Sequence, residues 1–286
     1  MAREAAFFDL DKTVIARASM IAFGRPFRRA GLLSRWVLVR ALWGQLVYLW
    51  IGADEKKLTK TRDAALKLTR GWDQQKVRSI VRDTIDEVIE PIVFEEALEL
   101  IRSHRADGRI VAIVSAAPEE VVQPLAEHLG ADLAIGTRAK VDEDGRYSGE
   151  LERYAYGPQK AEAVRELAGE MGIDLASSYA YSDSVTDLPM LEAVGHPVAV
   201  NPDRPLLRVA RERGWDVVHF VKPVRLRDRV PTPTPVQTAA GGGVSALVAT
   251  VAIVWWRLRR EPPAPPPSRA TKLRRRAASW RRPRRG

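Results

Sequence analysis

The sequence contains no cysteine and only four histidines, which narrows the chemistry that its 286 residues can perform. Without cysteine, a disulfide scaffold, a thiolate zinc site and a cysteine nucleophile are excluded. The histidines are scattered without the spacing of zinc ligands, which argues against a histidine-based zinc site. We therefore expect any bound metal to be a hard cation held by oxygen ligands.

The start of the chain also lacks the pattern of a secretory signal peptide. Its short apolar run, residues 5–8, ends in acidic residues instead of a small-residue cleavage site. We therefore expect the folded part of the protein to be cytoplasmic.

Acidic residues are scarce at the C-terminal end, and this scarcity accounts for the charge of the whole chain. The chain has 46 Lys and Arg residues against 36 Asp and Glu residues, a net charge of +10. Residues 257–286 hold twelve of the basic residues and one acid, so residues 1–256 hold 34 basic and 35 acidic residues, a net charge of −1. The basicity therefore belongs to a tail.

An apolar segment precedes this tail. Residues 239–256 contain no charged side chain and end in two tryptophans directly before Arg257. As a helix, the segment would be about 27 Å long, close to the ~30 Å hydrocarbon core of a membrane. We predict a membrane segment here, reached through a Pro-rich linker at residues 223–238. The alternative is a Gly- and Ala-rich linker that leads into a buried helix, but no folded domain follows to bury it.

The basic residues 257–286 are predicted to be disordered. They could bind anionic lipid headgroups, bind nucleic acid through its phosphates, or stay solvated. The neighbouring apolar segment favours an anionic membrane surface, and with it a membrane-associated protein. A spanning segment would place the tail outside the cytoplasm, against the positive-inside tendency, whereas a shallow segment would keep it inside. The sequence allows both.

Residues 1–222 read as a folded α/β protein. Apolar runs predict buried strands at residues 5–8, 110–114, 179–181 and 197–200. Helical periodicity predicts a helix from Asp73 to Ile89, capped by Asp73, and further helices lie between the later strands. Strands that alternate with helices in this way predict a doubly wound parallel sheet, which places its functional residues at the carboxyl ends of the strands.

Four short motifs carry candidate chemistry. The first, Asp9-Leu10-Asp11-Lys12-Thr13, follows the first strand. Two carboxylates two residues apart can act as a nucleophile and as a general acid and base on one substrate. Alone, the motif could also be a capped turn with solvated acids.

The other three motifs each follow a strand or begin a helix. Ser115 follows the second predicted strand, where a hydroxyl and free backbone N–H groups can hold a phosphate, although a helix-capping serine would look the same. Lys160 lies near the start of a helix and alone could be a solvated surface charge. Asp183 and Asp187 follow the third predicted strand and suit a hard divalent cation.

In this order the four motifs resemble those of the haloacid dehalogenase (HAD) superfamily, and most closely its phosphoserine-phosphatase-like subfamily IB hydrolases. The resemblance covers about residues 5–220. It implies a Rossmann-like catalytic core at residues 1–13 and 92–222, with a helical cap at residues 14–91 inserted after the first strand.

The resemblance also implies a role for each motif residue. Asp9 would be the nucleophile that forms an aspartyl-phosphate, and Asp11 would be the general acid and base. A Mg²⁺ ion would be held by Asp9, Asp11 and Asp183, with Asp187 in support. The residues implied to bind the substrate phosphate are Thr13, Ser115 and Lys160.

The resemblance departs from phosphoserine phosphatases at one position. Those enzymes carry a cap glutamate nine residues after the nucleophile, where this chain has Ala18. No acid occurs between Lys12 and Asp54. The departure argues against phosphoserine as the substrate, and a location near the membrane would suit a phospholipid-type monoester.

The sequence thus supports two hypotheses of different class. The favoured one is a Mg²⁺-dependent phosphomonoester hydrolase tethered to the membrane. The alternative is a catalytically silent protein that keeps the HAD scaffold and binds an anionic membrane or nucleic acid through its tail. All the acids and the lysine that the chemistry needs are present, which favours the enzyme.

Overall fold

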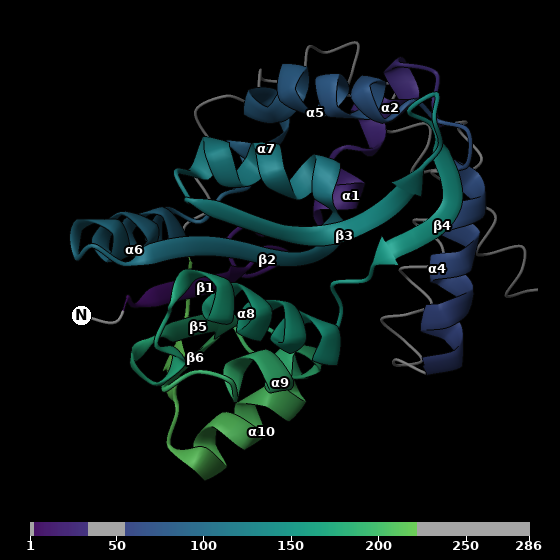
Figure 1. Ribbon diagram of the computed structural model, residues 1–286. Coiled ribbons are helices and arrows are strands. Elements are labelled where there is room, and N and C mark those ends of the chain that lie inside the picture. The colour runs from purple at the N-terminus through teal and green to yellow at the C-terminus, as the bar shows by residue number, and fades with distance from the viewer. Residues whose placement is uncertain (1–2, 34–54, 222–286) are drawn as a thin grey trace, which may run out of the picture. The chain divides into compact units, whose positions relative to one another are not determined.

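The computed structural model describes residues 3–33 and 55–221 (Figure 1). The predicted linker, apolar segment and basic tail, residues 223–286, lie outside the described residues. Within the described ranges, no helix is long and apolar enough to cross a membrane.

A seven-stranded sheet forms the centre of the fold, with β1 in its middle and the strand order β4-β3-β2-β1-β5-β6-β7. All neighbouring strands are parallel except β3 and β4. The predicted α/β, Rossmann-like doubly wound fold is therefore confirmed. The strands are β1 (Ala5–Asp9), β2 (Ile110–Pro118), β3 (Leu133–Val141), β4 (Tyr147–Arg153), β5 (Tyr179–Ser182), β6 (His196–Val200) and β7 (Asp216–Val218).

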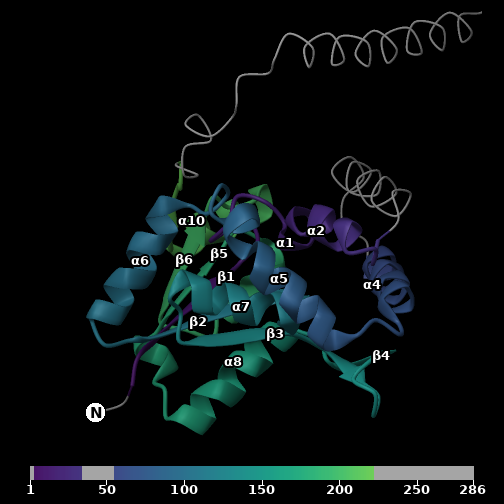
Figure 2. The same ribbon diagram turned by 90° about the horizontal axis from the view of Figure 1, so that it is seen from above.

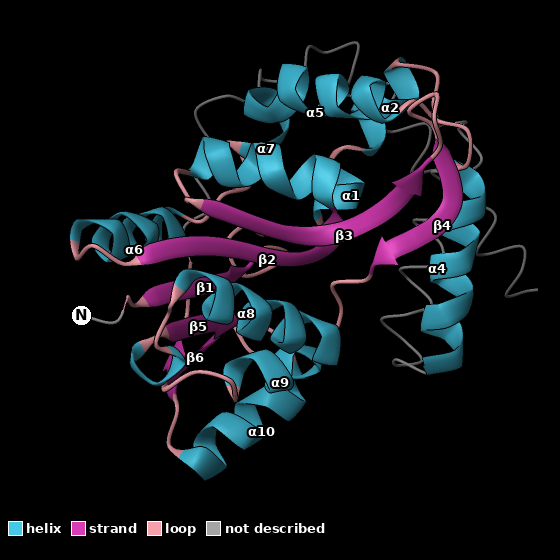
Figure 3. Cartoon of the chain, viewed as in Figure 1, coloured by secondary structure: helices cyan, strands magenta, loops and turns pink. Residues whose placement is uncertain are grey.

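Helices cover both faces of this sheet, as Figures 1 and 3 show. Helices α5, α6 and α7 contribute to one buried cluster, and α8, α9 and α10 contribute to the other. The helices are α1 (Ser19–Ala22), α2 (Gly24–Arg29), α4 (Glu55–Thr69), α5 (Gln74–Ile89), α6 (Glu95–Ala106), α7 (Glu119–Leu129), α8 (Pro158–Met171), α9 (Leu188–Leu191) and α10 (Arg204–Arg213), with short 3₁₀ turns η1 (Leu175–Ser177) and η2 (Val185–Asp187).

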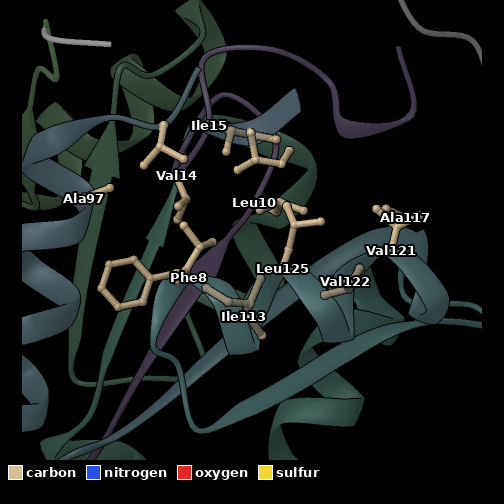
Figure 4. Close-up of a cluster of buried hydrophobic side chains, with 14 of the residues drawn as sticks. Phe8, Leu10, Val14, Ile15, Ala97, Ile113, Ala117, Val121, Val122 and Leu125 are labelled. Carbon is tan, nitrogen blue, oxygen red and sulfur yellow. The ribbon is translucent and has the colours of Figure 1, made fainter. Parts of the chain in front are cut away.

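The apolar run of β1 is buried on both sides because its side chains alternate between the two faces. Ala6 and Phe8 belong to the cluster on the α7 side, and Ala5 and Phe7 belong to the cluster on the α8 side. Figure 4 shows Phe8 and its neighbours in the first cluster. This double burial holds the end of β1, and with it Asp9, in a fixed place.

The predicted helix 73–89 is confirmed as α5. Asp73 caps it by accepting a hydrogen bond from the Lys76 backbone N–H at 2.8 Å. The helix lies against α7 (Figures 1 and 2), and it buries one face in the same cluster as Phe8. The buried residues of that face are Val77, Val81, Ile85 and Ile89.

Two strand predictions need correction. The strand predicted at residues 110–114 is longer, because β2 continues to Pro118 along β3 after a shift of register. The segment between α7 and α8, for which the sequence predicts no strand, is an antiparallel hairpin of β3 and β4. The Asp142 carboxylate organises its turn by accepting hydrogen bonds from the N–H groups of Asp144 and Arg146.

Helix α6 contains a histidine, His104, that is buried against the sheet. His104 is 5% exposed, and its Nε2 lies 2.7 Å from the Tyr181 hydroxyl, while Arg109 Nη1 lies 3.3 Å from its Nδ1. Because arginine can only donate, Nδ1 is the acceptor and Nε2 carries the proton. Burial, together with the charge of Arg109, lowers the pKa of His104 to about 4. The folded protein therefore holds this imidazole neutral.

We predict that the free energy of unfolding falls in acid because of His104. Above pH 6.5 the ring is neutral in both the folded and the unfolded chain, so its contribution is fully present. Between pH 6.5 and about 4, only the unfolded chain takes up the proton, which costs about 2 kcal/mol of stability by pH 5. Urea unfolding at pH 7 and pH 5 measures the loss.

The matched variant is His104→Gln, whose side chain can still accept from Arg109 and donate to Tyr181. Its free energy of unfolding should change with pH by about 2 kcal/mol less than that of the wild type over the same interval. An identical pH dependence in the two proteins would contradict the assignment.

Candidate active site

Three of the predicted site residues lie on neighbouring strands: Asp9 ends β1, Asp183 directly follows β5, and Ser115 lies within β2, level with the end of β1. Asp9 is the last residue of β1 and pairs in register with Val114 of β2, directly before Ser115. On the other side of β1, Asp183 follows the last residue of β5. The structure thus brings Asp9, Ser115 and Asp183 to one edge of the sheet, where doubly wound folds bind ligands.

A buried lysine joins two of the acids. Lys160 is 3% exposed, and its Nζ donates hydrogen bonds to Asp9 Oδ1 at 2.6 Å and to Asp187 Oδ2 at 2.8 Å. The Ser182 hydroxyl donates to the same Asp187 oxygen at 2.8 Å. Charge-assisted bonds of this length, inside the protein, fix the direction of the Asp9 carboxylate.

The backbone before α8 places Lys160. Gly157 precedes the helix with φ 57° and ψ −126°, a conformation open only to glycine. Pro158 follows at the first helical position, where its fixed φ suits a helix start. This turn directs the first turn of α8, including Lys160, at the end of β1.

A tight turn after β1 presents Asp11. The Leu10 carbonyl accepts hydrogen bonds from the N–H groups of Val14 and Ile15, at 2.9 and 3.0 Å, and Lys12 takes a positive φ of 67°. Asp11 Oδ1 accepts from the Ser19 backbone N–H at 2.8 Å. Asp11 is therefore held at the start of α1, two residues beyond Asp9.

The two predicted phosphate-binding hydroxyls are both buried. Thr13 is fully buried, and among the described residues its Oγ1 has no hydrogen-bond partner. Ser115 Oγ accepts from the Ala117 backbone N–H at 3.1 Å, which leaves its hydroxyl proton for another acceptor. An anion at the end of β1 could use both groups.

The electrostatics of the site follow from burying acids together. Burial raises the pKa of Asp9 to about 8, against the lowering effect of Lys160, and Asp187 and Asp183 raise it further. Burial also raises the pKa of Asp183 to about 6. Burial raises the pKa of Asp11 as well. These shifts arise mainly because burial disfavours the charged form of each carboxyl group, and Asp187 adds to the shift at Asp9 and at Asp183.

Asp9 and Asp183 are the carboxylates best suited to a metal ion. No group of three His, Asp or Glu side chains within residues 3–33 and 55–221 forms a metal site by itself. Mg²⁺ does not need one, because it commonly binds one or two carboxylates together with water and substrate phosphate. No described residue donates a hydrogen bond to the Asp183 carboxylate, so that group has oxygens to offer.

Two residues of the site were missed by the sequence-based prediction. Ser182 orients Asp187, and Asp203 supports the loop that carries Asp183, because its N–H donates to the Asp183 carbonyl at 2.7 Å and its carboxylate accepts from the Val185 N–H. Asp203 also caps α10, which is the only signal that its sequence position gives. Its contact with the Asp183 loop depends on the tertiary structure.

A cavity of about 380 Å³ has Asp11 in its wall. A larger cavity, about 610 Å³, is lined by residues of α6 and the end of α7 and contains none of the predicted site residues. Of these two cavities, the smaller one is therefore the one lined by a predicted site residue.

Comparison with known proteins agrees with this geometry. The family profile of haloacid dehalogenase-like hydrolases matches residues 6–192. A probable phosphatase of Mycobacterium tuberculosis is 50% identical over 250 residues, which cover 87% of both chains. The inhibition of morphological differentiation protein of Streptomyces azureus is 49% identical, covering 85% of this chain and 90% of its own. A phosphoserine phosphatase of M. tuberculosis is 33% identical, covering 86% and 80%.

Solved structures share the fold. A protein of unknown function from Bordetella pertussis Tohama I is 29% identical and superimposes with a TM-score of 0.66, covering 76% of this chain and 99% of its own. A phosphoserine phosphatase in apo form, 22% identical, has a TM-score of 0.52 and covers 80% and 100%. The chain therefore belongs to the haloacid dehalogenase-like hydrolase family and is a phosphatase-type enzyme of that family.

Proposed function

We propose that this enzyme hydrolyses phosphate monoesters through a covalent aspartyl-phosphate on Asp9, and that it requires Mg²⁺. The observation that supports the proposal is the placement of Asp9 at the end of the central strand, bound by Lys160 and followed two residues later by Asp11. The relatives named as phosphatases support the same reaction class.

The donor groups at the end of β1 suit Mg²⁺. The carboxylates of Asp9 and Asp183, with the backbone carbonyl of Asp11, would hold the ion. When bound, it supplies positive charge that lets the Asp9 carboxylate and an anionic phosphate approach each other. Burial raises the pKa values of Asp9 and Asp183, and a bound cation would stabilise both carboxylates in their charged form.

The side chains divide the reaction into two displacements. An Asp9 oxygen attacks phosphorus in line, and the bond from phosphorus to the alcohol oxygen breaks as Asp11 donates its proton to that oxygen. Asp11, now a carboxylate, accepts a proton from the water that attacks the aspartyl-phosphate, which releases phosphate and restores Asp9. Lys160, Ser115 and Thr13 donate to the phosphate oxygens as charge shifts onto them.

The first prediction from this mechanism concerns the nucleophile. Asp9→Asn keeps the shape of the side chain but removes its nucleophilic carboxylate, so phosphate release should fall by about 10³-fold or more. The measurement is phosphate release from a panel of small soluble phosphomonoesters with Mg²⁺, by the wild type and the variant.

Chelation of divalent ions provides the control for the metal. EDTA should abolish release by the wild type, and excess Mg²⁺ should restore it. Equal release by wild type and Asp9→Asn would refute the mechanism. Failure of both proteins across the panel with Mg²⁺ would favour the catalytically silent alternative.

A second prediction concerns the turn that positions Lys160. Gly157→Ala forces a Cβ into a backbone conformation that L-residues avoid, which should cost about 1–3 kcal/mol of stability. Because Lys160 lies three residues later, kcat should also fall by about 10- to 100-fold. Denaturant unfolding and steady-state kinetics measure the two effects.

Gly169→Ala is the matched control in the same helix. No atom lies within 4 Å of a Cβ built at Gly169, and its φ is not positive. Alanine there should leave kcat unchanged and raise the free energy of unfolding by about 0.5–1 kcal/mol. Similar kcat values in the two variants would contradict a role for Gly157 in placing Lys160.

We also propose that residues 239–256 and the basic residues after them attach the enzyme to the cytoplasmic side of a membrane. The support is the sequence alone: an uncharged stretch that ends in two tryptophans, followed by twelve basic residues. Such a location would bring the active site to lipid-derived or surface-bound substrates.

Flotation with vesicles tests this attachment. Full-length protein should float with vesicles that contain phosphatidylglycerol, while a chain that ends at Asp228, the last residue of the compact unit, should stay at the bottom. Flotation that persists in high salt would assign the attachment to the apolar segment instead of the basic tail. Equal flotation of the two proteins would remove the proposal.

A further inference from the structure

We infer that the leaving group of the substrate is a neutral, apolar alcohol, and that it binds in the cavity beside Asp11, the space of about 380 Å³ that has Asp11 in its wall. The inference rests on the proposed phosphatase reaction, in which Asp11 donates a proton to the leaving oxygen. It adds the chemical class of the alcohol, which the four motifs do not give.

The wall of this cavity contains two parts of the predicted site. One is Asp11, the proposed proton donor. The other is the strand segment that follows Ser115, since Ala116 and Ala117 line the same space. An alcohol whose oxygen lies within hydrogen-bond reach of Asp11 would therefore extend into this cavity.

The size and lining of the cavity suit a compact apolar group. A volume of about 380 Å³ is that of a small-molecule site. Helices α2, α4, α5 and α7 and the β3–β4 hairpin contribute to the wall, and α4 lies beside β4 in Figures 1 and 2. Most of the lining side chains are apolar, among them Met20, Phe27, Leu66, Trp72, Val121 and Leu151. An apolar group that enters this space leaves water, which favours its binding.

Glu120 is an acid in this wall whose hydrogen bonds are already made within the protein. It lies in the first turn of α7 and is 1% exposed. Gln74 Nε2 donates a hydrogen bond to its Oε1 at 2.6 Å. Tyr147, from the same wall, is a further hydrogen-bond partner of the carboxylate, and burial together with Glu120 raises the pKa of this hydroxyl, which therefore keeps its proton. The Glu120 carboxylate is thus held by protein donors.

The other polar groups of the wall are engaged in the same way. The Arg62 guanidinium donates to Asp63 Oδ1 at 3.1 and 3.0 Å and lies over the Tyr154 ring. The hydroxyls of Thr69 and Thr137 each donate to a backbone carbonyl. These side chains therefore have their main hydrogen-bond partners inside the protein.

This lining disfavours a charged leaving group. An ammonium or carboxylate group that enters the cavity loses its water, and the charged groups in the wall, Glu120 and Arg62, already have partners. Asp11 adds no charge while it holds its proton, and burial raises its pKa. A neutral, apolar alcohol pays no such desolvation cost, so the cavity selects it over charged or strongly polar alcohols.

Three soluble esters test the inference with full-length protein and Mg²⁺. They are 3-phenylpropyl phosphate, 3-hydroxypropyl phosphate, in which a hydroxyl replaces the phenyl group, and 2-amino-3-phenylpropyl phosphate, which adds an amine. We expect kcat/KM for the first ester to exceed that of each of the others by about tenfold or more, because the phenyl group leaves water and the amine finds no partner. An equal or higher kcat/KM for either of the other two esters would overturn the inference.

A further comparison separates the two sources of an apolar alcohol, a lipid and a soluble compound. Phosphate release from phosphatidic acid in vesicles is measured against release from 3-phenylpropyl phosphate in solution, at equal concentration of ester. Once the soluble esters show the expected preference, faster release from the vesicles assigns the alcohol to a lipid. Faster release from the soluble ester assigns it to a soluble compound. Both results uphold the class of the alcohol.

Leu66→Gln tests the apolar wall. Leu66 lies half-buried on α4 and lines the cavity, and glutamine has a similar size and helix propensity, so the helix should form as before. The ratio of kcat/KM for 3-phenylpropyl phosphate to that for 3-hydroxypropyl phosphate should fall by about fivefold or more. A ratio equal to that of the wild type would contradict binding of the apolar group in this cavity.

Leu68→Gln is the matched control on the same helix. Leu68 is 39% exposed and does not line the cavity. The same ratio should stay at its wild-type value in this variant. A similar fall in both variants would assign the preference to α4 as a whole and would refute the role of the cavity wall.

Inhibition of the wild type gives a measurement that needs no variant. The alcohol 3-phenylpropan-1-ol should inhibit about tenfold more strongly than 1,3-propanediol, and equal inhibition would overturn the inference. Release of phosphate from 3-hydroxypropyl phosphate by the wild type but not by Asp9→Asn would uphold the proposed function even where the phenyl group brings no advantage. If none of the esters is hydrolysed, the proposed function and this inference fail together.

Discussion

The buried ammonium of Lys160 is the interaction on which the site depends. It joins the end of β1 to the η2 turn, by bonding Asp9 and Asp187 at once. Asp9 and Asp187 come from separate parts of the chain, and two carboxylates buried together need a positive charge between them. The fold brings that charge from the first turn of α8, and the glycine before the helix sets its direction. A phosphate that enters this site meets Asp9 already oriented and the lysine already desolvated.

Sequence patterns predicted those helices and strands that are determined by a few residues close together in the chain. The apolar run of β1 and the periodic face of α5 are each visible over a few residues, and both were found. The motif acids were found because they follow predicted strands. The β3–β4 hairpin was missed because β3 (Leu133–Val141) mixes apolar residues with Arg138 and Lys140 and so lacks a buried apolar run.

Glu120, in the wall of the cavity beside Asp11, shows why other features could not be predicted. An acid in the first turn of a helix is expected at the surface, where it interacts with the helix dipole. Only the packing of α5 and the β3–β4 hairpin around the start of α7 buries this acid, and there Gln74 of α5 donates a hydrogen bond to it. The region predicted as a cap thus does two things: it adds apolar side chains to the core cluster, and it closes one wall of the cavity beside Asp11.

The two edges of the sheet have a consequence for association between copies of the protein. At one edge, β7 has only three residues; at the other, β4 carries the charged residues Glu150, Glu152 and Arg153. Short strands and charged strands are poor templates for pairing with another chain. Where many copies are crowded together, the backbone groups at the edges of this sheet therefore offer little opportunity for sheets to join and aggregate.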